Sequence, residues 1–229
     1  MYGAQPLDQG QFGYIYQIVE DLCHNANMPM PKLWYIQTPM ANAFATGRNP
    51  THASVAVTQG ILDVLDKHEL RGVLAHELSH VRNRDILVAT VAATIAMSIA
   101  YLADMLRWTL FWGGGDRDRN QVSGWGAILI AILMPFAAMM VQFAISRSRE
   151  YLADESGAEI SHDPLALASA LEKLDYNIKS KNMKPDSYAK TSTSSLFIIY
   201  PFLGNGLINL FSTHPPMQKR IERLRRMSY

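Results

Sequence analysis

Two long apolar runs without a charged residue constrain this chain more than any other feature. The first is Ile86–Ala103, with 18 residues, and the second is Val122–Ile145, with 24 residues. An α-helix needs roughly 20 apolar residues to cross a hydrocarbon layer about 30 Å thick. The second run has that length. The first reaches it if its helix continues towards Trp108 and Trp112, which suit a membrane interface.

A short polar stretch between the runs predicts that they form a transmembrane hairpin. It reads GGGDRDRNQ and spans residues 113–121. Two spans return the chain to the side of the membrane that it left. Pro135 would kink the second span without preventing the crossing. Because the first run is short for a span, two buried helices of a soluble core are the alternative.

The segments on either side of the hairpin predict one α+β domain. Apolar residues at helical spacing over Phe12–Asn25 are followed by short strand patterns at Lys32–Gln37 and Ala53–Thr58. Later helices are expected at 146–160, 164–174 and 216–227, and a polar loop at Lys179–Ser195. We predict a mostly helical catalytic domain with a small sheet, formed by residues 1–85 and 146–229, with 86–145 as the inserted hairpin. Leu196–Phe211 is either a third membrane element or a loop over a groove, and its breaks at Pro201, Gly204 and Gly206 favour the loop.

Residues 75–80 read AHELSH, on a helix that Asp66 and Glu69 are expected to open as a capping box. His76 and His80 lie four apart and share a helix face, so both imidazoles can bind one ion. Glu77 lies about 100° round the helix, beside that ion, where a base can take a proton from water. A surface helix with two solvated histidines is the alternative.

A catalytic zinc ion needs a third protein ligand and an open position. A third histidine six residues after His80, with a glycine between, is excluded because isoleucine and asparagine occupy those positions. A carboxylate from a later helix is the other option. Glu150 and Asp154 lie four apart on one helix face, so we assign Glu150 as the third ligand. Asp154 then accepts from a ligand histidine's other N–H. An ordinary acidic helix face, extended by Glu155 and Glu159, is the alternative.

The hairpin brings these residues to one face of the membrane. His80 lies six residues before the first run and Glu150 five after the second, so each is within about 10 Å of the boundary at 1.5 Å per residue. The basic residues beside the hairpin on this side favour a cytoplasmic active site: Arg82, Arg84, Arg147 and Arg149.

Composition excludes other classes. The net charge of +1 gives no reason to expect nucleic-acid binding. The single cysteine, Cys23, excludes an intrachain disulfide. The polar N-terminus shows no secretory signal.

Five segments together make the chain resemble the HtpX-like membrane zinc metalloproteases, relatives of the CAAX prenyl proteases. They are NAFATG (42–47), VAVTQGIL (55–62), AHELSHVRNRD (75–85), SRSREYLADESGA (146–158) and LFSTHPPMQKRIERL (210–224). The resemblance implies a gluzincin fold with one Zn²⁺ per chain, in a multi-pass protein of the bacterial inner membrane. It implies protein or peptide substrates, the lipid bilayer as a partner, and endoproteolytic quality control of misfolded or membrane proteins under stress. It also implies two membrane spans ahead of the catalytic domain, for which residues 1–85 contain no suitable apolar run.

The resemblance carries roles onto individual residues. It makes His76, His80 and Glu150 the metal ligands and Glu77 the general base. It points to His214 as a hydrogen-bond donor to the oxyanion and to Arg220 as holding nearby negative charge.

The same resemblance places a substrate-binding edge strand at NAFATG. There a substrate would add as a further strand through main-chain hydrogen bonds, and Asn42, Ala43 and Phe44 are the candidate contacts.

Two other classes of protein remain open at this point. A membrane scaffold with structural zinc would have four protein ligands, of which His214 could be one. A soluble helical protein with an accidental motif would be extracted without detergent.

Overall fold

The structure, a computed structural model, describes residues 3–112, 124–180 and 215–227; the side chains at 109–112, 124–128 and 130–132 also lie outside the description. The chain divides into two compact units. Unit 1 comprises residues 1–86 and 147–229, and unit 2 comprises residues 87–146. The described elements are β1 (Gln5–Pro6), α1 (Gln9–Asn25), β2 (Lys32–Ile36), β3 (Ala43–Thr46), the 3₁₀ helix η1 (Pro50–His52), β4 (Ser54–Thr58), α2 (Gln59–Val64), α3 (Lys67–Arg82), α4 (Asp85–Trp112), α5 (Gly124–Ser161), α6 (Pro164–Ser180) and α8 (Met217–Arg225).

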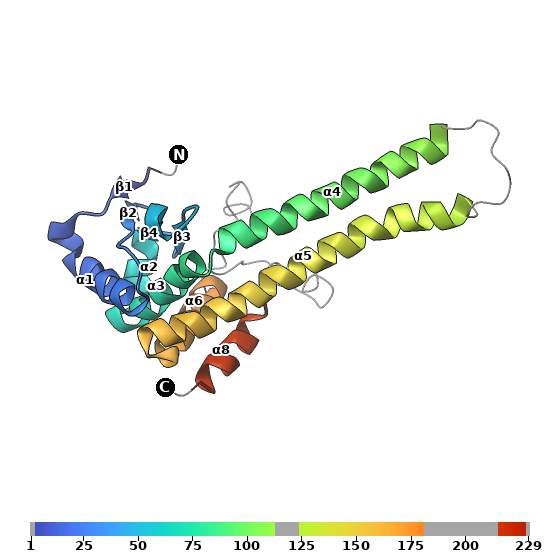
Figure 1. Cartoon of the computed structure of the whole chain (residues 1–229). Helices are drawn as coiled ribbons and strands as arrows, with labels where there is room; N and C mark the ends of the chain where they lie inside the picture. The colour runs from blue at the N-terminus through green and yellow to red at the C-terminus, as the bar shows by residue number, and fades with distance from the viewer. Residues whose placement is uncertain (1–2, 113–123, 181–214, 228–229) are drawn as a thin grey trace. The chain divides into compact units, whose positions relative to one another are not determined.

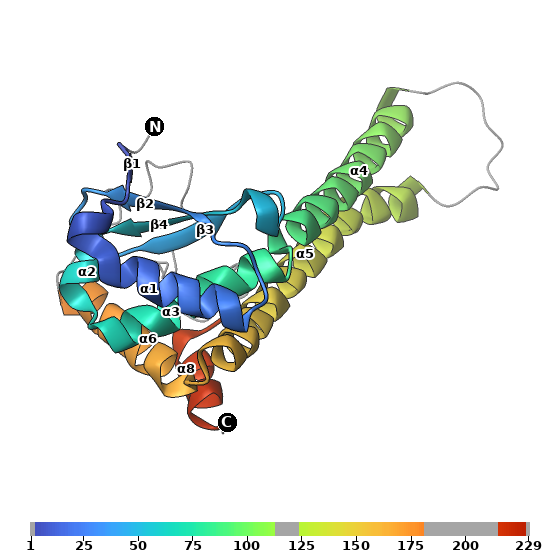
Figure 2. The same cartoon turned by 60° about the vertical axis from the view of Figure 1, so that its left-hand side comes forward.

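Unit 1 contains a four-stranded mixed sheet in the order β1-β2-β4-β3. β2 and β4 run parallel, while β1 and β3 pair antiparallel with their neighbours. The helices α1 and α3 lie along one side of this sheet (Figure 2). A mostly helical domain with a small sheet is therefore confirmed. The two predicted strands are β2 and β4; the short β1 was not predicted.

The helix α3, which bears the AHELSH motif, forms the centre of unit 1. It opens with the predicted capping box: the Asp66 side chain accepts from the Glu69 N–H, and the Glu69 side chain accepts from the Asp66 N–H. Gly72 allows α6 to approach closely, because a Cβ there would lie 2.5 Å from the backbone nitrogen of Leu167. Eleven of the 16 residues in α3 are buried, among them His76 and Glu77 of the AHELSH motif.

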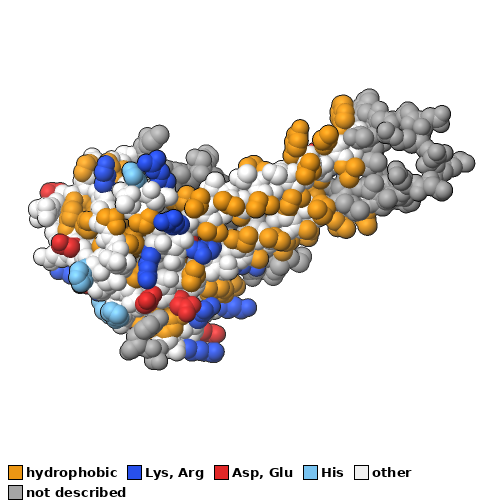
Figure 3. Space-filling view, in the orientation of Figure 1, with side chains coloured by type: hydrophobic (Ala, Val, Ile, Leu, Met, Phe, Trp, Pro, Cys, Tyr) orange, Lys and Arg blue, Asp and Glu red, His pale blue; other side chains and the backbone are white. Residues whose placement is uncertain are grey.

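Unit 2 consists of the long apolar parts of α4 and α5, which run alongside one another (Figure 1). Among the described residues, Asp85–Trp108 is the one segment long and apolar enough to cross a membrane, and only 6% of its most apolar window is buried. Hydrophobic side chains are exposed along these helices, as Figure 3 shows. Ten of the 24 residues of the second run, 122–128 and 130–132, have side chains outside the description, and the transmembrane hairpin stays a prediction.

Two helix boundaries differ from expectation. α5 continues without a break from Gly124, through Pro135, to Ser161, so the second apolar run and the expected helix at 146–160 are one helix. The sequence near Ile145 and Ser146 contains no glycine or proline that would end the helix there. α6 extends to Ser180 and takes in the start of the expected loop, where Lys179 pairs with Asp175 at 2.6 Å. The rest of that loop and Leu196–Phe211 lie outside the described residues.

Candidate metal centre

Three side chains from α3 and α5 converge in unit 1. One ligand atom each from His76, His80 and Glu150 lie within 4.8 Å of one another. The Nε2 atoms of His76 and His80 are 3.1 Å apart. Oε2 of Glu150 lies 3.8 Å from His76 Nε2, and its Oε1 lies 3.8 Å from His80 Nε2. Residues 70 positions apart in the sequence thus present their donor atoms to one point.

These distances fit a zinc ion. Tetrahedral zinc with bonds of about 2.0–2.1 Å holds its ligand atoms roughly 3.3–3.4 Å apart. The observed separations of 3.1, 3.8 and 3.8 Å lie on either side of that value. Two imidazoles and a carboxylate are also the donor set of many catalytic zinc sites. Among the residues the structure describes, the cluster has three such ligands.

Asp154 and Arg220 both contact the ring of His76. Its Nδ1 lies 3.0 Å from Asp154 Oδ1, and its Nε2 lies 3.4 Å from Nη2 of Arg220. Arg220, from α8, binds Asp154 through Nε at 2.8 Å and Nη2 at 2.6 Å, and its Nη1 lies 3.3 Å from Glu150. Burial alone would raise the pKa of Asp154, but the charge of Arg220 and the contact with His76 outweigh it and lower that pKa. The carboxylate therefore stays ionised beside the ring.

The position of Arg220 determines what it can do. Its side chain is 1% exposed and is enclosed by Asp154 and Glu150, so it contacts the ligand set from within the domain. The attraction of these carboxylates raises its pKa although burial alone would lower it. Arg220 can therefore position the ligands. His214, the expected oxyanion donor, lies outside the described residues.

His80 has a matching partner that the sequence did not reveal. Its Nδ1 lies 2.7 Å from Oδ2 of Asp85, the first residue of α4. Arg149, from α5, donates through Nε to the other oxygen of Asp85 at 2.6 Å. Burial alone would lower the pKa of His80, but the hydrogen bond to Asp85 and the charges of Glu150 and Glu77 raise it to about 9.

A turn explains why Asp85 was missed. On a continuous helix a residue five positions after His80 would point about 140° away from it. Here α3 ends at Arg82, and Arg84 adopts the left-handed conformation with φ of 53°. This reversal returns the Asp85 carboxylate to His80. A left-handed arginine has no sequence signature, so the contact between Asp85 and His80 could not be predicted from residue spacing, although Asp85 belongs to the resemblance segment 75–85.

Glu77 connects the helix α3 to the edge strand β3. Its side chain is buried, and its Oε2 accepts a hydrogen bond from the Ala45 N–H in β3 at 3.0 Å. Burial raises the pKa of this carboxyl, against the lowering effects of His80, His76 and the Ala45 N–H. A carboxylate with a raised pKa next to a metal site suits a general base.

The predicted substrate residues lie in and just before the last strand of the sheet. β3 is the last strand of the sheet. The Thr58 N–H donates to the Asn42 carbonyl, so in the alternating antiparallel pattern the main-chain groups of Ala43 and Ala45 point away from β4. Asn42 itself is buried just before the strand, and Phe44 is partly exposed.

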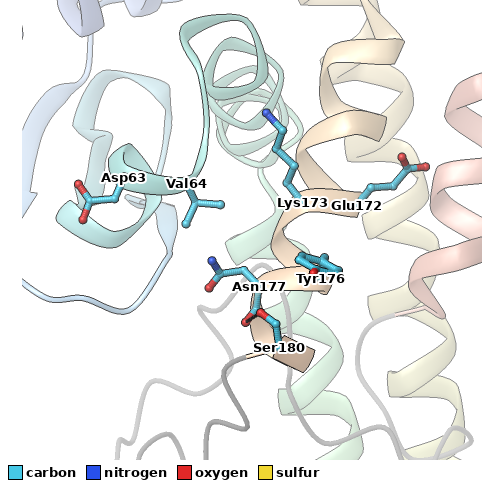
Figure 4. A pocket seen from close by; sticks show the side chains of 7 residues that line it. All are labelled: Asp63, Val64, Glu172, Lys173, Tyr176, Asn177 and Ser180. Atoms are coloured by element: carbon cyan, nitrogen blue, oxygen red, sulfur yellow. Dashed lines mark hydrogen bonds between the residues drawn. The ribbon is translucent and has the colours of Figure 1, made fainter.

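A separate pocket of about 490 Å³ lies between α2 and α6 (Figure 4). Its lining includes Asp63, Lys173 and Tyr176 and none of the converging ligands. Tyr176 is 75% exposed, and Lys173 pairs with the capping-box residue Glu69. This hollow is an open surface groove unconnected with the metal centre.

Comparison with known proteins gives concordant matches. A model of Peptidase family M48 matches residues 9–228. Similar sequences include the Protease HtpX homolog of Syntrophobacter fumaroxidans, 52% identical in an alignment of 230 positions that covers 99% of this chain and 80% of that protein. The Protease HtpX homolog of Aquifex aeolicus is 50% identical in an alignment of 229 positions that covers 98% of this chain and 74% of that protein.

A solved structure shares the fold. The crystal structure of S. mikatae Ste24p superposes with a TM-score of 0.65 at 19% identity and covers 97% of this chain. The chain spans 52% of the length of that structure.

Proposed function

Because the chain belongs to Peptidase family M48 and is a protease, we propose that it is a zinc-dependent endopeptidase that acts on misfolded or membrane proteins. The observation that carries this proposal is the convergence of His76, His80 and Glu150 within 4.8 Å, with Glu77 beside them. Metal-assisted peptide hydrolysis needs ligands for the metal ion and a base for the attacking water. Two imidazoles and one carboxylate would be the ligands, and a second carboxylate, which is not a ligand, would be the base.

His76, His80 and Glu150 would hold the zinc ion. When bound, the ion polarises the scissile carbonyl and makes water acidic enough to ionise near neutral pH. Glu77 takes the proton from the attacking water and later delivers it to the leaving amine. The Ala45 N–H at 3.0 Å keeps the Glu77 carboxylate aimed at the reacting atoms.

The edge strand β3 is the proposed place for the substrate. The outward main-chain groups of Ala43 and the carbonyl of Ala45 would pair with an extended peptide, so recognition would depend on backbone and not on one side chain. This suits a protease for unfolded segments, which share an accessible backbone and little else. Asn42 would hold the start of the strand, since its carbonyl is bound to Thr58.

We place the enzyme in the cell membrane, as a multi-pass protein with the metal centre on the cytoplasmic side. The exposed apolar segment Asp85–Trp108 supports membrane association. The arginines at 82, 84, 147 and 149 support the orientation.

The test is cleavage of an unfolded protein, such as β-casein, by the full chain in detergent with added Zn²⁺. Glu77→Gln keeps the size of the side chain and its acceptor for Ala45 but removes the base. We expect it to bind Zn²⁺ like the parent and to lose about a hundred- to ten-thousand-fold in kcat/KM. His76→Ala and Glu150→Ala should lose Zn²⁺ itself.

Glu159→Gln is the matched control, since its side chain is 60% exposed on α5 and touches no ligand. Equal cleavage by the parent and Glu77→Gln would refute the assigned base. Zinc binding without cleavage in the parent would favour a scaffold with structural zinc instead.

A further inference from the structure

The bond between Asp85 and Arg149 lies where the chain leaves and re-enters unit 1. Asp85 lies two residues before unit 2 begins at Leu87, and Arg149 lies three residues after unit 2 ends at Ser146. Arg149 binds Asp85 through both Nε and Nη2, and Nη2 also donates to the Asn83 carbonyl at 2.8 Å. This contact therefore ties the exit and the return of the chain together within unit 1.

Both carboxylate oxygens of Asp85 are in use. Oδ1 accepts from Arg149, and Oδ2 lies 2.7 Å from His80 Nδ1. A hydrogen bond at Nδ1 fixes the tautomer that leaves the Nε2 lone pair free, and it fixes the plane of the ring. A plain role as the acidic first-turn residue of α4 requires neither partner.

A similar series of residues occurs at the other imidazole, where Nδ1 of His76 lies 3.0 Å from Asp154 without the alignment of a hydrogen bond. Arg220, Asp154 and His76 form one arginine–carboxylate–histidine series, and Arg149, Asp85 and His80 form a second. The two series differ in their surroundings. The side chains of Arg220 and Asp154 are each 1% exposed, whereas those of Arg149 and Asp85 are 22% and 12% exposed. The second series is therefore the more accessible and the more easily opened of the two.

We propose that Asp85 and Arg149 are a positioning pair that orients His80 and sets the metal affinity of the centre. The proposal rests on the proposed function only in requiring that the centre bind zinc. Arg149 acts through Asp85, and Asp85 acts through His80. Any movement that separates the exit of the chain from its return would release His80 and weaken the site. The pair thus makes the metal centre responsive to strain at the junction with the apolar helices.

The test is Zn²⁺ affinity of the full chain in detergent, measured by competition with a chromophoric chelator, together with the absorption spectrum of the Co²⁺-loaded protein. We expect Asp85→Asn to bind Zn²⁺ about 10- to 100-fold more weakly, as for other residues that support a ligand histidine. Arg149→Gln should weaken binding in the same direction by a smaller factor. The double variant should lose no more than Asp85→Asn alone, because the arginine acts through the aspartate. The Co²⁺ spectrum should change in each variant, since the geometry of a ligand changes.

Arg82→Gln is the matched control. Arg82, the last residue of α3, pairs with Glu159 of α5 at 3.1 Å, but this pair is exposed and touches no ligand. It should leave Zn²⁺ affinity and the Co²⁺ spectrum unchanged. If Asp85→Asn does not fold, Arg149→Gln decides the question alone.

The proposal would be overturned by a folded Asp85→Asn that binds Zn²⁺ within twofold of the parent, or by the same result for Arg149→Gln where that variant decides. It would also be overturned if the losses of affinity multiply in the double variant. A parent that binds no Zn²⁺ is the third such outcome. A parent that binds Zn²⁺ without cleaving casein, and whose variants bind it more weakly, would support this pair while refuting the proposed function.

Discussion

Replacing Arg220 by methionine tests the electrostatics of the centre most directly. Methionine keeps much of the apolar stem and removes the guanidinium. Asp154, itself 1% exposed, then loses two hydrogen bonds of 2.8 and 2.6 Å, and Glu150 loses a contact of 3.3 Å. Neither carboxylate can turn to water, because both residues are buried.

Removing one partner of a buried ion pair costs about 3–5 kcal/mol, since the other charge is left uncompensated. For a domain the size of unit 1, each kcal/mol lowers the unfolding midpoint by roughly 2–4 °C. We therefore expect Arg220→Met to lower the midpoint of the metal-free protein by about 6–20 °C. Added Zn²⁺ should recover part of this loss, because a divalent cation beside Glu150 compensates the same negative charge.

The assay is thermal unfolding of the detergent-solubilised chain, followed by circular dichroism with and without Zn²⁺. Arg223→Met is the control, because Arg223 also joins α8 to α5 through Glu155 at 3.2 Å, but both side chains are about half exposed. Such a pair contributes at most about 1 kcal/mol. Equal shifts for Arg220→Met and Arg223→Met would refute the argument from burial, and no recovery with Zn²⁺ would refute the argument from charge.

Two further outcomes follow from burial and close packing. Burial raises the pKa of the Cys23 thiol to about 11 from 9.0. At pH 8, Ellman's reagent should therefore react far more slowly with the folded protein than with the unfolded one. Similar rates for the two would contradict this. Because the pKa is raised on folding, the stability that this thiol contributes is present below pH 9 and is lost as the pH rises towards 11. Gly72→Ala should destabilise unit 1 by about 1–3 kcal/mol in thermal unfolding, since its Cβ would meet the backbone of Leu167 at 2.5 Å. Gly13→Ala in α1, with nothing within 4 Å of its Cβ, should be neutral or slightly stabilising, and equal losses at both positions would refute the packing argument.

Patterns repeated along the chain made much of the fold predictable. The spacing of Asp66 and Glu69 predicted the capping box, and alternating β-branched residues predicted β4. Helical spacing also singled out the residue pairs whose side chains the structure brings together, at His76 and His80 and at Glu150 and Asp154. In each case the two residues of the pair lie on one regular element, so the sequence interval alone puts them on one face of it.

Contacts that depend on irregular backbone were not predictable in this way. Asp85 reaches His80 because Arg84 adopts a left-handed conformation, and the Ala45 N–H reaches Glu77 because β3 ends the sheet. Strand order and a single strained residue leave no periodic pattern. The burial of Arg220 was also hidden, since a short basic helix ordinarily indicates a solvated surface.

The charges around the donor atoms provide a physical reason for a divalent ion. Four carboxylates touch the centre among the described residues: Glu77, Glu150, Asp154 and Asp85. The two arginines in contact with them, one for each positioning aspartate, compensate half of this charge. With the imidazoles left out of the count, the four carboxylates and two arginines leave a formal charge of about −2 in a largely buried site, which is costly unless a cation compensates it. Because Arg220 lies between Asp154 and Glu150, it cannot fully compensate both carboxylates, and a divalent ion would be attracted to this cluster.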